Sequence, residues 1–330
     1  GHRALADIPD ALRSLPREEV PLYGYNILGV GALRAFLSPS PVAAAPSESS
    51  TALPELPPLS ALVDEIAASG HGLVLVTGKG GVGKTTVAAA IAVDLAARGL
   101  AVHLTTTDPA AHVVATLDED VPGLRVSRID PKAETESYIR KALDAAAPGK
   151  DAAGLEEDLR SPCTEEVAVF HAFSKLIAGA RREIVVMDTA PTGHTLLLLD
   201  ATGSYHREML KKFGGRALGT PMTRLRDPEH TRVLIVTLAE TTPVLEAAEL
   251  QADLRRAGIE PYAWVINASL AGLQLADPVL VDRARAERAE IERVRTRHAG
   301  RLALVPWQPT EPTSPERLGR LASRPTAPAR

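Results

Sequence analysis

The chain has 330 residues, of which 45% are hydrophobic, 3% are aromatic and a single one, Cys163, is a cysteine. Its formal net charge of −4 gives no reason to expect a nucleic-acid partner, and no apolar run approaches the roughly 20 residues of a membrane span. One cysteine excludes a disulfide within the chain and suits a reducing cytosol, so we expect a soluble protein with an aliphatic core.

The first 37 residues are similar to the far end of the chain. Residues 12–16 predict a strand and residues 31–36 a helix, with a loop between them. Residues 302–321 loosely repeat this order of elements. Because such a repeat is typical of duplicated domains, we interpret residues 1–37 as the C-terminal tail of a preceding homologous domain, with coincidence as the alternative.

A change in composition separates this segment from the main domain. Residues 38–58 are rich in Pro, Ser and Ala and predict a flexible linker. Residues 59–330 then form the principal domain, which opens with a short amphipathic helix that Ser60 could cap. The chain begins at Gly1 without an initiator methionine, which is typical of a processed or recombinant fragment.

A glycine-rich loop connects an apolar run at residues 73–77, which predicts a buried strand, to a helix-forming run at residues 87–96. The loop comprises Gly78, Lys79, Gly80, Gly81, Val82, Gly83, Lys84, Thr85 and Thr86. In this context the backbone N–H groups and the helix N-terminus would hold a phosphate. Lys84 would reach the β- and γ-phosphates, and the Thr85 hydroxyl would bind Mg²⁺. The alternative is a turn that merely joins a strand to a helix.

Strands and helices alternate through the rest of the chain. Further strands are predicted at residues 101–106, 124–128, 183–188, 233–237, 262–267 and 302–305. Helices are predicted within residues 132–180, from near Pro243 and at residues 279–299. Residues 203–230 are polar and basic and predict a mobile loop. This order predicts an α/β fold with a mostly parallel, doubly wound sheet, whose ligand site lies at the carboxyl ends of the strands.

Two aspartates follow predicted strands at that edge. Asp188 ends the strand at residues 183–188 and would hold Mg²⁺, as a Walker-B aspartate does. Asp108 follows the strand at residues 101–106, where it could orient the attacking water and also touch the Mg²⁺ shell. Lys79 is not needed to hold phosphate in its own loop, so it could reach the phosphates of a facing subunit or domain. Turn or capping aspartates and a solvated lysine are the alternatives.

Four stretches of the sequence carry a family resemblance. Residues 78–86 resemble the deviant Walker A motif of the superfamily that contains ParA, MinD and the nitrogenase iron protein. Residues 107–112, 160–166 and 188–195 are similar to motifs of the arsenite-pump ATPase family, ArsA. The resemblance covers most of residues 57–320. It implies a P-loop ATPase that corresponds to the second of two homologous halves, preceded by the linker and the tail of the first half.

This resemblance also implies an activity and a set of partners. The activity would be Mg²⁺-dependent ATP hydrolysis, stimulated by As(III) or Sb(III), that drives a membrane arsenite carrier of the ArsB type. The protein would be cytoplasmic and peripheral, at the inner face of the plasma membrane when it is bound to the carrier. The homologous first half or a second copy of this chain would face the Lys79 surface. A metalloid-delivering chaperone is a further implied partner.

The same resemblance assigns roles to individual residues. Asp108 matches the switch aspartate that orients water, and Asp188 matches the Mg²⁺-linked aspartate. Asn267 matches the asparagine that reads adenine, and residues 306–313 would lie over the base. The family's As(III)/Sb(III) ligands match Cys163, His194 and Ser161. Because one cysteine cannot supply three thiolates, the other ligands would come from the partner; a buried apolar cysteine is the alternative.

Two other classes of protein remain as alternatives. A targeting ATPase for tail-anchored membrane proteins would bind an apolar helix in a Met-rich groove, but the chain has only three Met and no Cys-x-x-Cys pair. A positioning ATPase of the ParA or MinD type would need a basic face or an amphipathic C-terminal helix. The proline-broken tail at residues 323–330 cannot form that helix.

Overall fold

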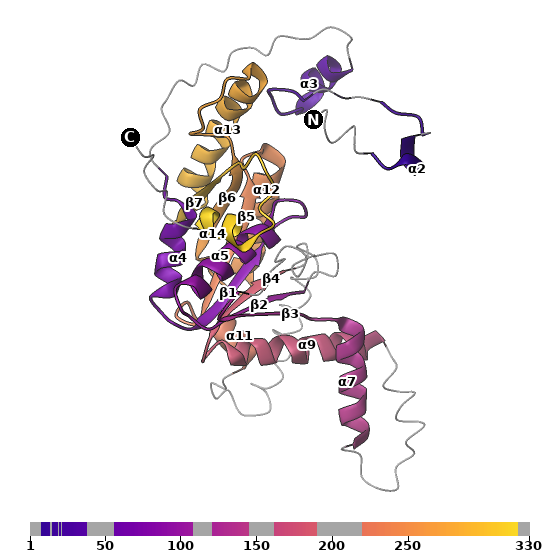
Figure 1. Cartoon of the computed structure of the whole chain (residues 1–330), viewed down its shortest axis with the longest axis vertical. Coiled ribbons are helices and arrows are strands. Elements are labelled where there is room, and N and C mark those ends of the chain that lie inside the picture. The colour runs from indigo at the N-terminus through magenta and orange to yellow at the C-terminus, as the bar shows by residue number, and fades with distance from the viewer. Residues whose placement is uncertain are drawn as a thin grey trace.

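The computed structural model describes residues 8–13, 15–18, 20, 22–37, 56–107, 121–144, 162–189 and 220–322. Its centre is a seven-stranded sheet in which each pair of neighbouring strands is parallel (Figure 1). In spatial order the strands are β3 (Leu124–Arg128), β2 (Val102–Thr106), β4 (Ile184–Asp188), β1 (Gly72–Thr77), β5 (Thr231–Leu238), β6 (Ala263–Ser269) and β7 (Leu302–Pro306). The predicted α/β fold is confirmed.

Helices cover both faces of this sheet, as a doubly wound fold requires. One face is covered by α4 (Leu59–Ala67), α5 (Lys84–Ala97) and α14 (Pro315–Ala322). The other is covered by α9 (Pro162–Gly179), α11 (Pro221–Leu225), α12 (Thr241–Arg256) and α13 (Pro278–Arg297). Helix α7 (Pro131–Asp144) packs against α9 beyond the sheet (Figure 1). None of the described helices is long and apolar enough to cross a membrane.

The strands divide their apolar side chains between two cores, because successive residues of a strand point to opposite faces. In β1, Val74 and Val76 pack with the helices α4, α5 and α14. Leu73 and Leu75 pack with the helices of the other face. All four side chains are at most 1% exposed. Burial on both faces is the reason that the strands read in the sequence as continuous apolar runs.

Part of the N-terminal segment, around Tyr23 and Gly24, contacts α13, whereas α2 lies well away from that helix (Figure 1). Arg283 on that helix donates a hydrogen bond to the carbonyl oxygen of Tyr23 at 3.4 Å. Gly24 approaches the helix so closely that an added Cβ would lie 2.7 Å from the Cβ of Asp282. The segment ends in α3 (Gly29–Phe36), which confirms the helix predicted at residues 31–36.

The strand predicted at residues 12–16 is wrong. Helix α2 (Asp10–Arg13) occupies the start of this stretch instead. Its hydrogen bonds are local, from the amide of Leu12 to the carbonyl of Pro9 at 2.9 Å and from Nε of Arg13 to the carbonyl of Ile8 at 3.1 Å. A strand needs a neighbouring strand to satisfy its backbone groups, and no described residue of the chain supplies one here.

Two smaller predictions also need correction. Ser60 does not cap α4, because the N-cap position is Pro58 and Ser60 lies buried in the first turn. The segment predicted as a mobile loop at residues 203–230 contains α11, whose Met222 and Leu225 are each 2% exposed. Burial of these two apolar side chains against the sheet helices fixes this part of the segment.

Candidate nucleotide-binding site

The glycine-rich loop between β1 and α5 is held close to two neighbouring strands. Gly78 has φ +151°, and a Cβ built there would lie 2.3 Å from the carbonyl oxygen of Val236 on β5. Gly83 has φ +87°, and a Cβ there would lie 2.1 Å from Nδ2 of Asn267 on β6. Only glycine fits this backbone path, since other residues are disfavoured at positive φ and would clash. The loop is therefore a tight cradle at the carboxyl edge of the sheet.

Lys84 is the first residue of α5 and lies inside this cradle. Its side chain is buried, at 6% exposure, and its Nζ donates a hydrogen bond to the carbonyl oxygen of Lys79 at 2.8 Å. The ammonium group thus lies next to the positive end of the α5 dipole. Two positive features at one point on the sheet edge favour an anion. The phosphate contact expected of Lys84 stays a prediction.

Side-chain oxygens from one helix and two strands meet at the residue that follows Lys84. Thr85 Oγ1 donates a hydrogen bond to Oδ2 of Asp188 at 2.7 Å, and Thr106 Oγ1 donates to the same atom at 3.2 Å. Asp188 is fully buried at the end of β4. The structure brings Thr85 and Asp188 together, and their role in holding Mg²⁺ stays a prediction. The sequence analysis does not include Thr106 in the site, although the run of threonines at residues 105–107, at the end of β2, is a signal for it.

These oxygens suit the ion that the fold implies. Mg²⁺ prefers hard oxygen ligands, and in P-loop proteins it is held by the loop threonine and a strand-end aspartate. Thr85 and Asp188 supply such a pair within 2.7 Å of each other. The donor set therefore fits Mg²⁺.

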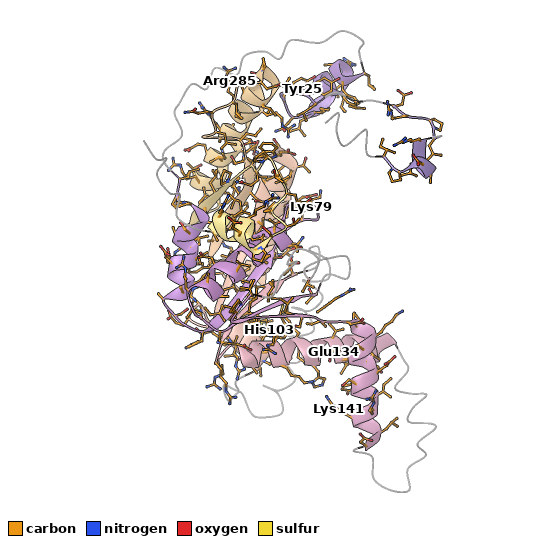
Figure 2. The ribbon with its side chains drawn as sticks, in the orientation of Figure 1. Tyr25, Lys79, His103, Glu134, Lys141 and Arg285 are labelled. Carbon is orange, nitrogen blue, oxygen red and sulfur yellow. The ribbon has the colours of Figure 1, made fainter. Side chains whose placement is uncertain are left out.

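Lys79 lies at the surface of the same loop, where Figure 2 labels it, and 45% of its side chain is exposed. Its Nζ forms an ion pair with Oε1 of Glu246 on α12. The other carboxylate oxygen, Oε2, is buried and has no hydrogen-bond partner within the described chain. Lys79 is thus held by its own chain in this structure. No local signal in the sequence points to Glu246, because it lies 167 residues from Lys79 on a helix with no motif around it.

Asn267 joins the glycine-rich loop to the end of β6. Its Nδ2 donates a hydrogen bond to the carbonyl oxygen of Val82 at 3.0 Å. Trp307, the first residue after β7, donates its amide to the carbonyl oxygen of Ser269 at 2.8 Å. The structure thus brings the residue expected to read adenine and the start of the loop expected to cover the base to the same edge of the sheet.

The remaining predicted site residues fall in parts of the chain that the structure does not describe. Asp108, Ser161 and His194 lie outside the described residues. Cys163 lies in the first turn of α9, and only its backbone is described. The predictions for the water-orienting aspartate and for the metalloid ligands therefore stay predictions.

A buried lysine at the start of α5 and an aspartate hydrogen-bonded to the next threonine, both at the carboxyl edge of a parallel sheet, define a P-loop nucleotide-binding protein. A family model described as Anion-transporting ATPase (ArsA_ATPase) matches residues 71–223. The chain belongs to this family, as the resemblance implied.

Individual relatives agree with this assignment. The "Arsenical pump-driving ATPase" of Escherichia coli is 56% identical over 324 residues, which is 97% of this chain and 56% of that protein. A protein of Aquifex aeolicus (strain VF5), also named for the arsenical pump, is 30% identical over 58% of this chain and 77% of its own length. "ATPase GET3A" of Arabidopsis thaliana is 28% identical over 59% of this chain and 66% of its own length. The chain spans little more than half of the Escherichia coli protein.

Proposed function

We propose that this chain is the second ATP-hydrolysing half of an arsenical pump-driving ATPase. In this proposal residues 1–37 are the tail of the first half, residues 38–58 are the linker, and residues 59–330 are the ATPase domain. The observation that carries it is the 2.7 Å contact between Thr85 and Asp188 beside the buried Lys84, in a chain 56% identical to a named arsenical pump-driving ATPase.

Different residues of the cradle would bind the phosphates, the base and the Mg²⁺ ion. Backbone amides of residues 78–86 and the ammonium of Lys84 would bind the phosphates, and Asn267 would read adenine. Thr85 and Asp188 would hold Mg²⁺, with Asp108 in its shell. When bound, this ion would neutralise charge on the phosphate oxygens. Asp108 would also orient the attacking water, which makes the reaction chiefly one of positioning and charge stabilisation.

The coupled solute in this proposal is As(III) or Sb(III). Thiolate is a soft ligand that suits a thiophilic ion, and Cys163 with His194 and Ser161 would contribute to its site. The single cysteine requires additional thiolates from the first half or from a second copy of the chain. The assembly would act at the cytoplasmic face of the membrane, on a carrier of the ArsB type, with a metalloid-delivering chaperone as a further partner.

Arsenite stimulation is the first expected result. Steady-state phosphate release should rise with arsenite, and more so at higher protein concentration, because two copies are needed to complete the ligand set. Cys163→Ser should remove the stimulation and leave the basal rate within about twofold, since the thiol touches the metalloid and not ATP. Turnover that ignores arsenite at every concentration, in this chain and in a protein containing both halves, would contradict the proposal.

Lys79 provides a test of the facing partner. Lys79→Ala should lower turnover at least about tenfold and leave the ATP affinity within about threefold, because its ammonium would act on the neighbouring subunit's phosphates. Mixing the Lys79→Ala and Lys84→Ala chains should then restore activity, since one mixed site has both lysines. If Lys79 instead acts on the nucleotide bound by its own chain, mixing the two variants should restore no activity. No restoration at concentrations where the chain dimerises would disprove action across an interface.

A further inference from the structure

The end of β6 is fastened by a buried carboxylate from another element. Glu287 on α13 is only 9% exposed. Its Oε2 accepts hydrogen bonds from Ser269 Oγ at 2.7 Å, from the Leu270 amide at 2.8 Å and from the Ala271 amide at 3.2 Å. Burial raises the pKa of Glu287 above its ordinary value, and these three donors oppose that rise. A buried acid satisfied in this way fixes the position of the groups that bond to it.

The segment that Glu287 holds contains a residue, Ala268, with an unfavourable backbone conformation. Ala268 has φ +51°, and it is the one residue other than glycine with a positive φ in the described chain. The pairing of β6 with β7 also shifts register between Ile266 and Ser269. A non-glycine residue keeps this conformation only where its surroundings impose it. The hydrogen bonds to Glu287 begin directly after Ala268, and Asn267 lies directly before it.

The same turn also anchors the loop after β7. The carbonyl oxygen of Ser269 accepts the amide of Trp307 at 2.8 Å. Ser269 therefore bonds to Glu287 through its side chain and to Trp307 through its backbone. Displacement of Ser269 would move two elements together: Asn267 on one side and the loop that Trp307 begins on the other.

We propose that Glu287 is a positioning residue for recognition of the nucleotide base. It holds residues 268–271, at the end of β6 and in the turn that follows, and these residues hold Asn267 and the loop that begins at Trp307. An adenine ring would be read between Asn267 and this loop. Asparagine suits adenine, because its amide can donate to one ring nitrogen and accept from the exocyclic amine. Glu287 touches neither base nor phosphate. The inference rests on the role of Asn267 in the proposed function.

The test separates the base from the phosphates. Affinities for Mg-ATP, Mg-GTP and Mg-tripolyphosphate are measured by calorimetry for the wild-type protein and for Glu287→Ala, Glu287→Gln and Ser269→Ala. We expect Glu287→Ala to weaken ATP binding about tenfold, as loss of alignment does, and to bring the ATP-to-GTP affinity ratio close to one. Tripolyphosphate binding should stay within about twofold, because the glycine-rich loop is untouched.

Glu290→Gln is the matched control on the same helix. Glu290 is 5% exposed, and its Oε1 accepts from Thr241 Oγ1 at 2.7 Å while Oε2 accepts from Arg293. The Glu290→Gln variant removes a buried carboxylate charge of α13 without touching the turn that Glu287 holds. It can therefore lower the melting temperature but should keep the ATP-to-GTP affinity ratio. If Glu287→Ala fails to fold, Ser269→Ala carries the test. Glu287→Gln is the conservative variant and should keep the ATP-to-GTP ratio near the wild-type value, because its amide oxygen can still accept the three hydrogen bonds.

Two outcomes separate this inference from the proposed function. If Asn267→Ala abolishes base selectivity but Glu287→Ala and Ser269→Ala keep it, the positioning role of Glu287 is wrong. If Asn267→Ala leaves the ATP-to-GTP ratio unchanged, the base-reading role in the proposed function is wrong, and the inference falls with it. A loss of tripolyphosphate binding equal to the loss of ATP binding would also overturn the inference, because it would indicate a general collapse of the site.

Discussion

Lys84→Ala is expected to lower the rate of ATP hydrolysis about 1,000-fold, the size of effect found when one charged or hydrogen-bonding group is removed from around a transferring phosphoryl group. The ammonium of Lys84 is buried in the glycine-rich loop and donates to the carbonyl of Lys79 at 2.8 Å. Alanine leaves the loop backbone in place but removes this positive charge. ATP affinity should also fall, since in the proposed function the lysine contacts the phosphates in the ground state as well.

Phosphate release and ATP affinity are measured side by side in this experiment. Lys132→Ala, on the exposed surface of α7, is the matched control, because it removes a lysine of the same charge away from the cradle. Its turnover should stay within about twofold of the wild-type value. A Lys84→Ala protein that kept a tenth or more of the wild-type rate would show that this cradle is not the hydrolytic site.

Asp188→Asn is expected to slow hydrolysis about 100-fold and to raise the Mg²⁺ concentration for half-maximal activity about tenfold. Asparagine keeps the shape of the side chain and can still accept a hydrogen bond from Thr85, now 2.7 Å from Asp188 Oδ2. It removes the negative charge, however, and a neutral amide is a weaker ligand than a carboxylate for a hard cation. The effect should therefore appear in the Mg²⁺ dependence and not only in the maximum rate.

Asp94→Asn is the matched control, because it also removes a buried acidic charge, here on α5, the helix that carries Thr85. Asp94 is 8% exposed on α5 and pairs with Arg98, one end of the helix away from the cradle. This variant should lose stability without a change in the Mg²⁺ dependence. An unchanged Mg²⁺ requirement in Asp188→Asn would show that Asp188 supports the fold and does not hold the ion.

The fold was predictable where burial left a local pattern in the sequence. Parallel strands that are covered on both faces read as continuous apolar runs, which is why residues 73–77 and 183–188 were recognised as strands. The stretch at residues 12–16 was misread because its apolar residues had no partner strand in the described chain. Helix α11 was missed because it is short and its two buried residues stand in a polar context.

The site was predictable to the extent that its motif is contiguous. Strand, glycine-rich loop and helix follow one another directly, so the roles of Lys84 and Thr85 could be inferred from residue types and order alone. Asp188 could be added because ligands gather at the carboxyl ends of parallel strands. Each of these inferences depends on chemistry that is local in the chain or on a general rule for the fold.

Residues distant in the chain became partners only through packing. The lateral order of the strands places β4 and β5 on either side of β1, although β4 begins 112 residues and β5 begins 159 residues after the start of β1 at Gly72. That order brings Thr106 to Asp188, and the helix after β5 brings Glu246 to Lys79. The glycine-rich motif alone specifies a phosphate cradle, because backbone geometry there is a local property; which side chains complete it depends on strand order and helix docking, which no short stretch of sequence encodes.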